Sequence, residues 1–325
     1  MGTRVISSGF TRWLLVLAAL CASSAWSQSY PSRPIKIIVP FTPGGGNDLF
    51  ARAVGQKLQE RLGQPVIVEN KPGGGGNIGA EFVAKSTPDG YTLLVGQNGL
   101  TMLPWLYKSL PFDVEKSFAP IGIGATVPIA VAVSNKLPAT SINELIAYAR
   151  KNPGKLSYAT PGVGTPQHLA SEWFMNMTGT QMVQIPYKGA AGILTDLTSG
   201  DVQVMFGALN SAVPFSQAGK IRLLAVAEHQ RLAQFKEVPT VSESVPGYEV
   251  NIWYGLLAPA GTPDAILDLL SSEQRTIVNL PEVRENLARA SLGSNSTSAA
   301  EMRQIMKTEL DKWGKVVKAA GIQPQ

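Results

Sequence analysis

The chain has 325 residues, of which 44% are hydrophobic and 16% charged, a composition typical of globular proteins and a length sufficient for two domains. Its formal charge is +5, and the basic residues are scattered singly rather than in runs. Because nucleic-acid-binding proteins carry clustered basic residues or an aromatic–basic module, we expect no nucleic-acid partner. The mild positive balance loosely fits an anionic small ligand.

Residues 1–27 have the pattern of a cleavable export signal. Arg4 and Arg12 provide a positive start, an apolar run follows over 13–20, and Ala25 and Ser27 place small side chains at the −3 and −1 positions of a cleavage site. A transmembrane anchor fits less well, because the apolar run is shorter than the roughly 18 to 20 residues that span a bilayer. We therefore expect an exported protein whose formal charge falls from +5 to +3, since two arginines and no acidic residue leave with the segment.

Cys21 is the only cysteine, and cleavage after Ser27 removes it. It does not resemble a lipid-anchored cysteine, because Leu20 stands before it where such sites want a small residue. The mature chain is therefore expected to contain no disulfide, no thiolate nucleophile and no thiolate metal ligand.

After this segment, short β-rich runs alternate with longer helical patterns. Strands are predicted over 36–41, 64–69 and 91–95, with one helix that starts at Asp48 as N-cap and a second over 78–85. This β-α-β-α-β order is typical of a mostly parallel sheet with helices on its faces.

A similar unit recurs later in the chain. Its predicted strands cover 156–160, 182–185 and 202–206, and its predicted helices cover 167–177 and 191–197. The fold class is therefore predicted as α/β with two lobes. Segments 119–128 and 238–247, rich in Pro and Gly, are interpreted as the crossings between the lobes.

Two closing helices are predicted near 263–280 and 298–320, and we expect them to return to the first lobe. The predicted organisation is a signal peptide over 1–27, a discontinuous lobe 1 over 28–127 and 249–325, and lobe 2 over 128–248.

The loop over 41–48 lies between a predicted strand end and a helix start. Glycines allow a ligand close to the backbone, and the first N–H groups of a helix lack internal partners and carry partial positive charge. A carboxylate or phosphate is the natural occupant of such a site. The alternative is a plain tight turn in which Asp48 merely caps the helix. The candidate ligand-binding residues here are Phe41, Pro43, Gly44, Gly45, Gly46, Asn47 and Asp48.

The loop over 160–168 has the same strand, glycine and helix-start order in the other lobe. Two such ends at one crevice can hold a single anion from both sides, and open sheets bind ligands at the carboxyl ends of parallel strands. His168 is interpreted as a hydrogen-bonding residue rather than a catalyst, because no partner for catalysis is recognisable. The candidate residues are Thr160, Gly164, Thr165, Gln167 and His168.

Other chemical motifs are absent from the sequence or weak. Gly74, Gly76 and Gly79 satisfy G-x-G-x-x-G, but this run follows the second strand of the lobe, so a conformational role is preferred over dinucleotide binding. No zinc-type spacing, G-x-S-x-G, S-x-x-K or Walker A motif occurs, and the acidic residues are dispersed. We therefore expect no catalytic residue, no metal and no cofactor. The aromatic residues expected in the core rather than at a ligand are Trp173, Phe174, Trp253 and Tyr254.

Several segments, in order through essentially the whole mature chain, together carry a family resemblance. They are P-S-R-P-I-K over 31–36, P-F-T-P-G-G-G-N-D-L-F-A-R over 40–52, E-N-K-P-G-G-G-G over 69–76, P-D-G-Y-T-L-L over 88–94, T-P-G-V-G-T-P-Q-H-L-A over 160–170, P-Y-K-G over 186–189, V-P-T over 238–240 and L-A-P-A-G-T-P over 257–263. With these segments the chain resembles the Bug-type receptors, the periplasmic solute-binding components of tripartite tricarboxylate transporters.

The resemblance implies a type II periplasmic-binding fold whose two lobes close on a ligand. In relatives, the ligand carboxylate is held by the loops that match 41–48 and 160–168, partly through ordered waters. By position, Gly189 and Ala190 at a further helix start and Asn98 after the third strand are expected to line the cleft. Family ligands include dicarboxylates, tricarboxylates, acidic amino acids and aromatic carboxylates, and the variable positions Asn47 and Pro166 leave the distal half of the ligand open.

The function expected from this resemblance is a periplasmic receptor that delivers a small carboxylate to the membrane components of such a transporter. We expect a monomer. Two alternatives stay open: a sensor receptor that presents its loaded form to a signalling partner, and an exported hydrolase, for which His168 with Thr165 is the only candidate pair.

Overall fold

The computed structural model describes residues 30–163, 165–187, 190–232, 234–319 and 324. The predicted signal peptide and the predicted site residues Gly164 and Gly189 lie outside these ranges. The chain divides into two compact units, Met1–Ser32 and Arg33–Gln325. In the first unit only residues 30–32 are described, and they form neither helix nor strand. No helix within the described ranges is long and apolar enough to cross a membrane.

The first group of elements in the second unit is the predicted β-α-β-α-β unit, with bounds shifted by a few residues. The elements are β1 (Ile35–Val39), α2 (Gly46–Leu62), β2 (Val66–Asn70), the short 3-10 helix η1 (Gly74–Gly76), α3 (Asn77–Ala84), β3 (Thr92–Gln97) and α4 (Gly99–Leu106). β1 pairs in parallel with both β2 and β3. The β1 side chains Ile37, Ile38 and Val39 are fully buried, as expected for a parallel strand covered by helices.

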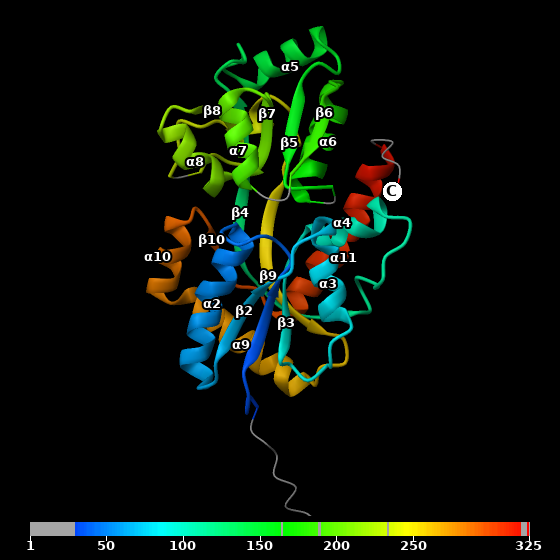
Figure 1. The fold of residues 1–325 in the computed structure, drawn as a ribbon, viewed down its shortest axis with the longest axis vertical. Coiled ribbons are helices and arrows are strands. Elements are labelled where there is room, and N and C mark those ends of the chain that lie inside the picture. Colours follow the sequence, from blue (N-terminus) through cyan, green and yellow to red (C-terminus); the bar gives the residue numbers. More distant parts are fainter. Residues whose placement is uncertain (1–29, 164, 188–189, 233, 320–323, 325) are drawn as a thin grey trace, which may run out of the picture. The chain divides into compact units, whose positions relative to one another are not determined.

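The second group repeats this arrangement. Its elements are α5 (Ile142–Lys151), β5 (Ser157–Thr160), α6 (Pro166–Thr178), β6 (Val183–Pro186), α7 (Ala190–Ser199), β7 (Val204–Ala208), α8 (Leu209–Gln217) and β8 (Ile221–Val226). β5 lies between β6 and β7 and pairs in parallel with both. In Figure 1 this group occupies the upper part of the ribbon and the first group the lower part.

Two long strands join the groups. The strand β4 (Phe118–Ser134) pairs with β9 (Asn251–Pro259) through residues 118–128, and then with β7 and β8 through residues 129–134. β9 lies between β3 and β4 and is antiparallel to both (Figure 1). The Pro- and Gly-rich segment 119–128, interpreted as a crossing, is an extended strand of the first sheet with register shifts at 120–122 and 123–125, and the chain passes to the second sheet only after Pro128. The short 3-10 helix η2 (Val241–Glu243) lies in the second predicted crossing.

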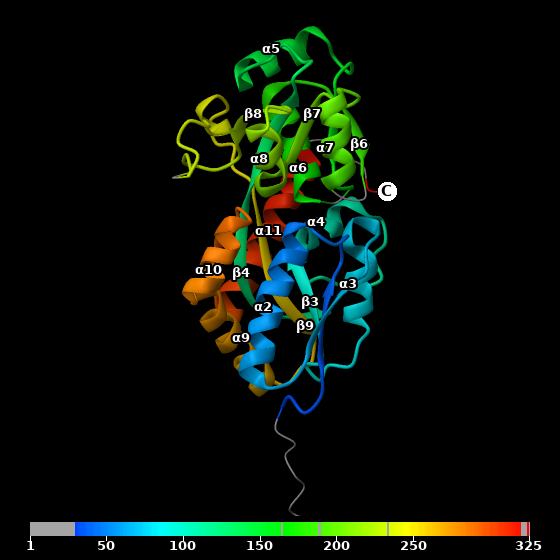
Figure 2. The ribbon, with the colours of Figure 1, turned by 60° about the vertical axis from the view of Figure 1, so that its left-hand side comes forward.

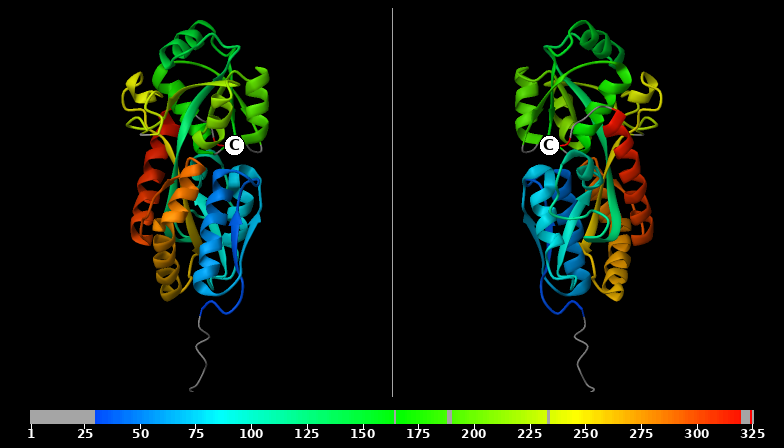
Figure 3. Two further views of the ribbon diagram at one scale, coloured as in Figure 1. Left: turned by 90° about the vertical axis from the view of Figure 1, so that its left-hand side faces the viewer. Right: turned by 90° about the vertical axis from the view of Figure 1, so that its right-hand side faces the viewer.

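The C-terminal elements pack back onto the first group. They are α9 (Asp264–Asn279), α10 (Pro281–Arg289), β10 (Gly293–Ser294) and α11 (Ala299–Ala319). α9 lies against β4 and α2, and α11 lies against β4 and α4 (Figure 2). α11 also contacts α6 of the second group. Figure 3 shows the red helix α11 extending from the first group to the level of the second. Each group has its own hydrophobic cluster, one around Ile38, Leu94 and Leu257 and one around Leu197 and Met205.

Candidate ligand-binding cleft

A cleft of about 620 Å³ lies where the carboxyl ends of parallel strands from both groups meet. In the first group it is lined by residues 41–47 after β1, by Gln97 at the end of β3 and by Tyr254 of β9. In the second group it is lined by residues that follow β5, by residues that follow β6, and by residues in and after β7. Carboxyl ends of parallel strands are where open α/β sheets bind ligands, so this cleft is the candidate site.

The start of helix α2 opens onto the cleft. The helix begins at Gly46, its N-cap is Gly45, and its first internal hydrogen bond runs from Leu49 N to Gly45 O at 3.0 Å. The amides of residues 46–48 precede that bond and so have no partner within the helix. The predicted N-cap at Asp48 is wrong, since Asp48 is the third residue of the helix. Two glycines in place of a capping side chain leave this helix start open to an anion.

Asp48 holds the loop rather than lining the cleft. Its carboxylate accepts hydrogen bonds from Gly44 N at 3.0 Å, from Arg52 Nε and Nη2 at 2.9 Å each, and from Asn70 Nδ2 at 3.1 Å. Asn70 Nδ2 also donates to Phe41 O at 3.0 Å. Burial alone would raise the pKa of Asp48, but the hydrogen bonds from Arg52, Gly44 and Asn70 hold it below its ordinary value. The ionised carboxylate therefore fixes both ends of the loop.

The second helix start differs from the first because it is already capped. Thr165 is the N-cap of α6, and its Oγ1 accepts from His168 N at 3.4 Å and donates to Gly162 O at 2.8 Å. Pro166 has no N–H, so Gln167 supplies the one remaining early amide of this helix. The side chain of Gln167 also lines the cleft, is only 6% exposed, and its Oε1 has no hydrogen-bond partner among the described residues. The two helix starts are therefore unequal: α2 offers backbone donors, and α6 offers chiefly Gln167.

Thr160 and His168 lie behind the second loop and do not line the cleft. Thr160 is fully buried, and its Oγ1 accepts from Gln184 Nε2 at 2.9 Å. His168 is 6% exposed, and its Nε2 lies 3.8 Å from Glu172 Oε1, which also accepts from Tyr158 Oη. Burial lowers the pKa of His168 to about 4, so the imidazole is neutral at neutral pH. Both residues are placed to support the loop.

Polar residues at the end of β3 connect the first loop to β9. Asn47 Nδ2 donates to Gln97 Oε1 at 3.4 Å, and both side chains line the cleft. The adjacent Asn98 does not line it, since its Nδ2 donates to the backbone oxygen of Asn251 at the start of β9, at 2.8 Å. Of the predicted residues, the structure thus brings Phe41, 43–47, Thr165 and Gln167 together in the cleft. Ala190 begins α7, but its side chain is not described.

The remaining wall of the cleft was not predicted from the sequence. Its residues follow β6 or belong to β7 and the start of α8, and they are Tyr187, Gly192, Ile193, Met205, Gly207, Ala208 and Ser211. The helix start after β6 was expected to contribute Gly189 and Ala190, and the rule used for the loop after β5, applied to the end of β7, would have found Ala208 and Ser211. Met205 and Gly207 lie within β7 and have no such local signal. Tyr254 was expected in the core. It is 2% exposed and stacks with Phe50 at 6.4 Å between centroids, yet it also lines the cleft.

The glycine run before α3 has a conformational role, as interpreted from its position. Residues 73–76 have φ values of 134°, 58°, 64° and 106°, in the region that favours glycine. A Cβ on Gly75 would lie 2.3 Å from the carbonyl oxygen of Val163 in the loop after β5. The run therefore allows the first group to approach the second at the level of the cleft.

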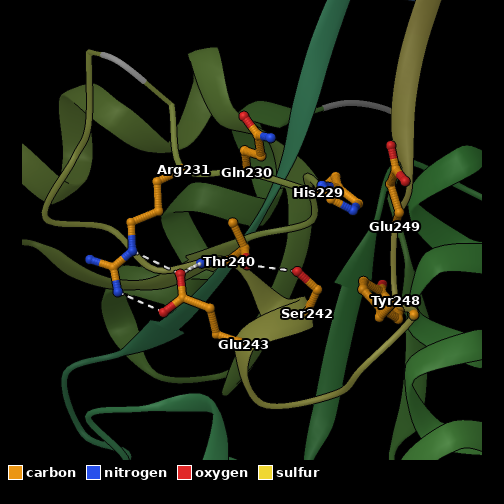
Figure 4. Close-up of a pocket in the computed structure, with 9 residues that line it drawn as sticks. His229, Gln230, Arg231, Thr240, Ser242, Glu243, Tyr248 and Glu249 are labelled. Atoms are coloured by element: carbon orange, nitrogen blue, oxygen red, sulfur yellow. Dashed lines mark hydrogen bonds and ion pairs between the residues drawn. The ribbon is translucent and has the colours of Figure 1, made fainter.

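A second pocket, of about 330 Å³, lies in the segment that leads into β9 (Figure 4). Two of its charged groups pair with each other: Arg231 Nε and Nη2 donate to Glu243 at 2.7 and 2.6 Å, and Glu243 completes a capping box with Thr240. The hydrogen bonds from Arg231 and Thr240 lower the pKa of Glu243 to about 2. Because these groups stabilise the segment itself, the larger cleft is the better candidate site. Within the described ranges, no group of three or more His, Cys, Asp or Glu could hold a metal ion.

Comparison with known proteins gives consistent relatives. The sequence-family model described as tripartite tricarboxylate transporter family receptor matches residues 50–322 of this chain. The UPF0065 protein in the tcbD–tcbE intergenic region of Pseudomonas sp. (strain P51) is 34% identical over 307 residues, which cover 93% of this chain and 91% of the relative.

Solved structures have the same fold. R. palustris Rpa4515 with adipate has a TM-score of 0.87 at 36% identity, covering 91% of this chain and all of that one. The periplasmic binding protein BugD has a TM-score of 0.85 at 33% identity, with coverage of 91% and 100%. MatC from Rhodopseudomonas palustris with bound malate has a TM-score of 0.83 at 28% identity, with coverage of 89% and 100%. These neighbours confirm the predicted fold class, an α/β periplasmic-binding fold with two lobes.

Proposed function

Because the chain belongs to the tripartite tricarboxylate transporter receptor family, as its resemblance to Bug-type receptors predicted, we propose that it captures a small carboxylate in the cleft and delivers it to the membrane components of such a transporter. The proposal includes export to the periplasm and action as a monomer. The observation that carries it is the uncapped start of α2, which opens onto the cleft that Gln167 lines from the other group. Free amides at a helix start are suited to a negative oxygen.

Simple energetics support a carboxylate as the occupant. A helix start contributes about 0.3–1 kcal/mol, and up to ~2 kcal/mol when partly buried. Hydrogen bonds to a charged group contribute roughly 1.5–3 kcal/mol each. A few such terms, less the entropy lost on binding, reach the ~8 kcal/mol of a micromolar complex. The adipate and malate described with two structural neighbours are both carboxylates, which supports the same chemistry here.

In this proposal the protein binds without turnover, and its two lobes close on the ligand. The proposed lobes are 28–127 with 249–325, and 128–248. The proposed boundary at 127/128 is supported by the partner change of β4 one residue later, since Pro128 pairs with β9 and Ile129 pairs with β7. Closure would then be a bend of β4 and of the chain just before β9, which begins at Asn251 opposite Pro128.

The test is a thermal-shift screen of the mature chain against carboxylic acids, each paired with its carboxamide. A ligand at 100 times its Kd stabilises the native state by about 2.7 kcal/mol, so at least one carboxylate should raise the Tm by several degrees and its amide should not. Hits are then titrated by calorimetry and incubated to look for products. The proposal is contradicted if no carboxylate shifts the Tm, if amides bind equally well, or if esters and amides are turned over.

A further inference from the structure

We propose that one wall of the cleft selects the body of the ligand, so that the substrate class is a carboxylate with an uncharged, hydrophobic body rather than a dicarboxylate of the same length. This wall, called the apolar wall, consists of Tyr187, Ile193, Met205 and Ala208. The inference rests on the proposed function, because it concerns the other half of the same cleft.

The apolar wall lies across the cleft from the proposed carboxylate position. The free amides of α2 belong to the first group, whereas all four wall residues belong to the second. Within the second sheet the order is β7-β5-β6, so wall residues from β7 and from the segment after β6 flank the β5 loop on both sides. A ligand whose carboxylate meets α2 therefore presents the rest of its structure to this wall.

The wall is part of the hydrophobic core of its lobe. Ile193 and Met205 are each 1% exposed and belong to one cluster with Leu194 and Leu197, against which Tyr187 also packs. Close packing on this side fixes the wall in place, so its shape and polarity are set before a ligand arrives.

Two glycines let the larger side chains lie along the backbone and leave space in the cleft. A Cβ on Gly207 would lie 2.3 Å from Met205 Cε, and a Cβ on Gly192 would lie 3.0 Å from Tyr187 Cδ1. The Tyr187 hydroxyl donates to Asp196 Oδ2 at 2.6 Å, which holds the ring beside Gly192. The polar end of Tyr187 is thus satisfied within the protein, and its ring is available as apolar surface.

These contacts predict the selectivity. Each methylene that leaves water for the wall should tighten binding about fourfold. A second carboxylate placed against the same uncharged side chains would lose its hydration without gaining a counter-charge from them. The start of α8, whose N-cap Ala208 makes no side-chain hydrogen bond, would return about 0.3–1 kcal/mol, a factor of about two to five in affinity, which is less than the removal of a carboxylate from water costs.

The test compares ligands of equal length by calorimetry on the mature protein at pH 7.5. Hexanoate and adipate differ only in a terminal methyl or carboxylate, and benzoate and terephthalate form the equivalent aromatic pair. We expect the monocarboxylate of at least one pair to bind at least tenfold tighter than its dicarboxylate. Tighter or equal binding of the dicarboxylate in both pairs, or binding of malate with none of these four, overturns the inference and leaves the proposed function standing. If no carboxylate binds at all, the proposed function itself fails.

Two variants locate the effect. Gly207→Ala forces Met205 to shift, because a Cβ there would lie 2.3 Å from Met205 Cε and 3.1 Å from its Cγ and Sδ, so it should lower the Tm and change the affinity for hexanoate at least fivefold more than that for acetate. Ser211→Lys adds a cation beside the wall on a partly exposed side chain, and it should raise the affinity for adipate relative to hexanoate at least tenfold. Unchanged ligand ratios in both variants would overturn the assignment of the wall.

Discussion

Replacing Gly75 with Ala should weaken ligand binding although Gly75 does not line the main cleft. A Cβ added at Gly75 would lie 2.3 Å from Val163 O, whereas ordinary van der Waals contact begins near 3.4 Å. The loop before α3 and the loop after β5 must therefore separate by about 1 Å. Because these loops belong to different groups, the separation opposes the close approach that the proposed closure requires. A closing equilibrium disfavoured by 1.4 kcal/mol lowers the affinity tenfold, and we expect a loss on the order of tenfold.

The substitution has a second, purely local cost that must be measured apart. Gly75 has φ 64° and ψ 17°, and an Ala in this left-handed conformation costs about 1–2 kcal/mol. Gly63, the C-cap of α2, has φ 67° and ψ 14°, and a Cβ added there would have no atom within 4 Å. Gly63→Ala is therefore the matched control, with the same backbone cost and no contact between the groups.

Urea unfolding should show similar losses of stability in the two variants, and calorimetry with the carboxylate selected by the screen should show weaker binding only in Gly75→Ala. If both variants bind the ligand as tightly as the parent, the approach of Gly75 to Val163 has no part in binding and the reasoning is refuted.

Three further predictions concern the loop and the buried acids. Gly45→Leu should weaken carboxylate binding at least a hundredfold by filling the cleft. It should lower the unfolding free energy by only about 1 kcal/mol, the cost of leucine in place of glycine at an N-cap, because φ −77° and ψ 170° suit any residue and the nearest atom to a Cβ there is 3.9 Å away; normal affinity by calorimetry would show that the site is misplaced. Asp48→Ala should lower the unfolding free energy by about 2 kcal/mol at pH 7. Because the pKa of Asp48 is lowered in the folded protein, the difference between variant and parent should shrink when urea unfolding is repeated at pH values falling below 3.8. A difference that stays constant with pH would argue against the ionic role of Asp48. Burial raises the pKa of Glu309 to about 7 although Trp253 and Thr101 donate hydrogen bonds to its carboxylate, so the contribution of Glu309 to stability is present below pH 4.5 and is lost as the pH rises through 7. Glu309→Gln should remove up to about 3 kcal/mol of this pH dependence of the unfolding free energy. An unaltered slope of the unfolding free energy between pH 4.5 and 8 would contradict this prediction.

The site was partly predictable because some of its signals are local. The loop over 41–47 was found from the sequence, since a strand, glycines and a helix start lie within a dozen residues and each leaves a compositional mark. Asp48 was assigned the wrong helix position for a local reason as well: an acidic residue near a helix start is typical both of an N-cap and of the first turn. Only the backbone geometry distinguishes the two.

The rest of the cleft depends on contacts between distant segments. Met205 and Ile193 have the same local character as any core residue, and only the placement of β7 and α7 beside the β5 loop brings them to the cleft. Tyr254 is both a core residue and a lining residue, because β9 is inserted between β3 and β4. The segment 119–128 contains prolines and glycines that favour a loop, but Gly124 is needed where the Phe50 ring would lie 2.5 Å from a Cβ.

The position of β9 also bears on when the protein can fold. The first sheet needs a strand from residues 251–259 between two strands that are complete by residue 134. During synthesis, more than a hundred residues beyond residue 134 must therefore be made before β9 can complete the first sheet. Contacts between residues so far apart in sequence form slowly. The second group, whose strands are complete by residue 226 and whose hydrophobic cluster is complete by residue 238, does not depend on β9, so the order of synthesis separates the completion of the two cores.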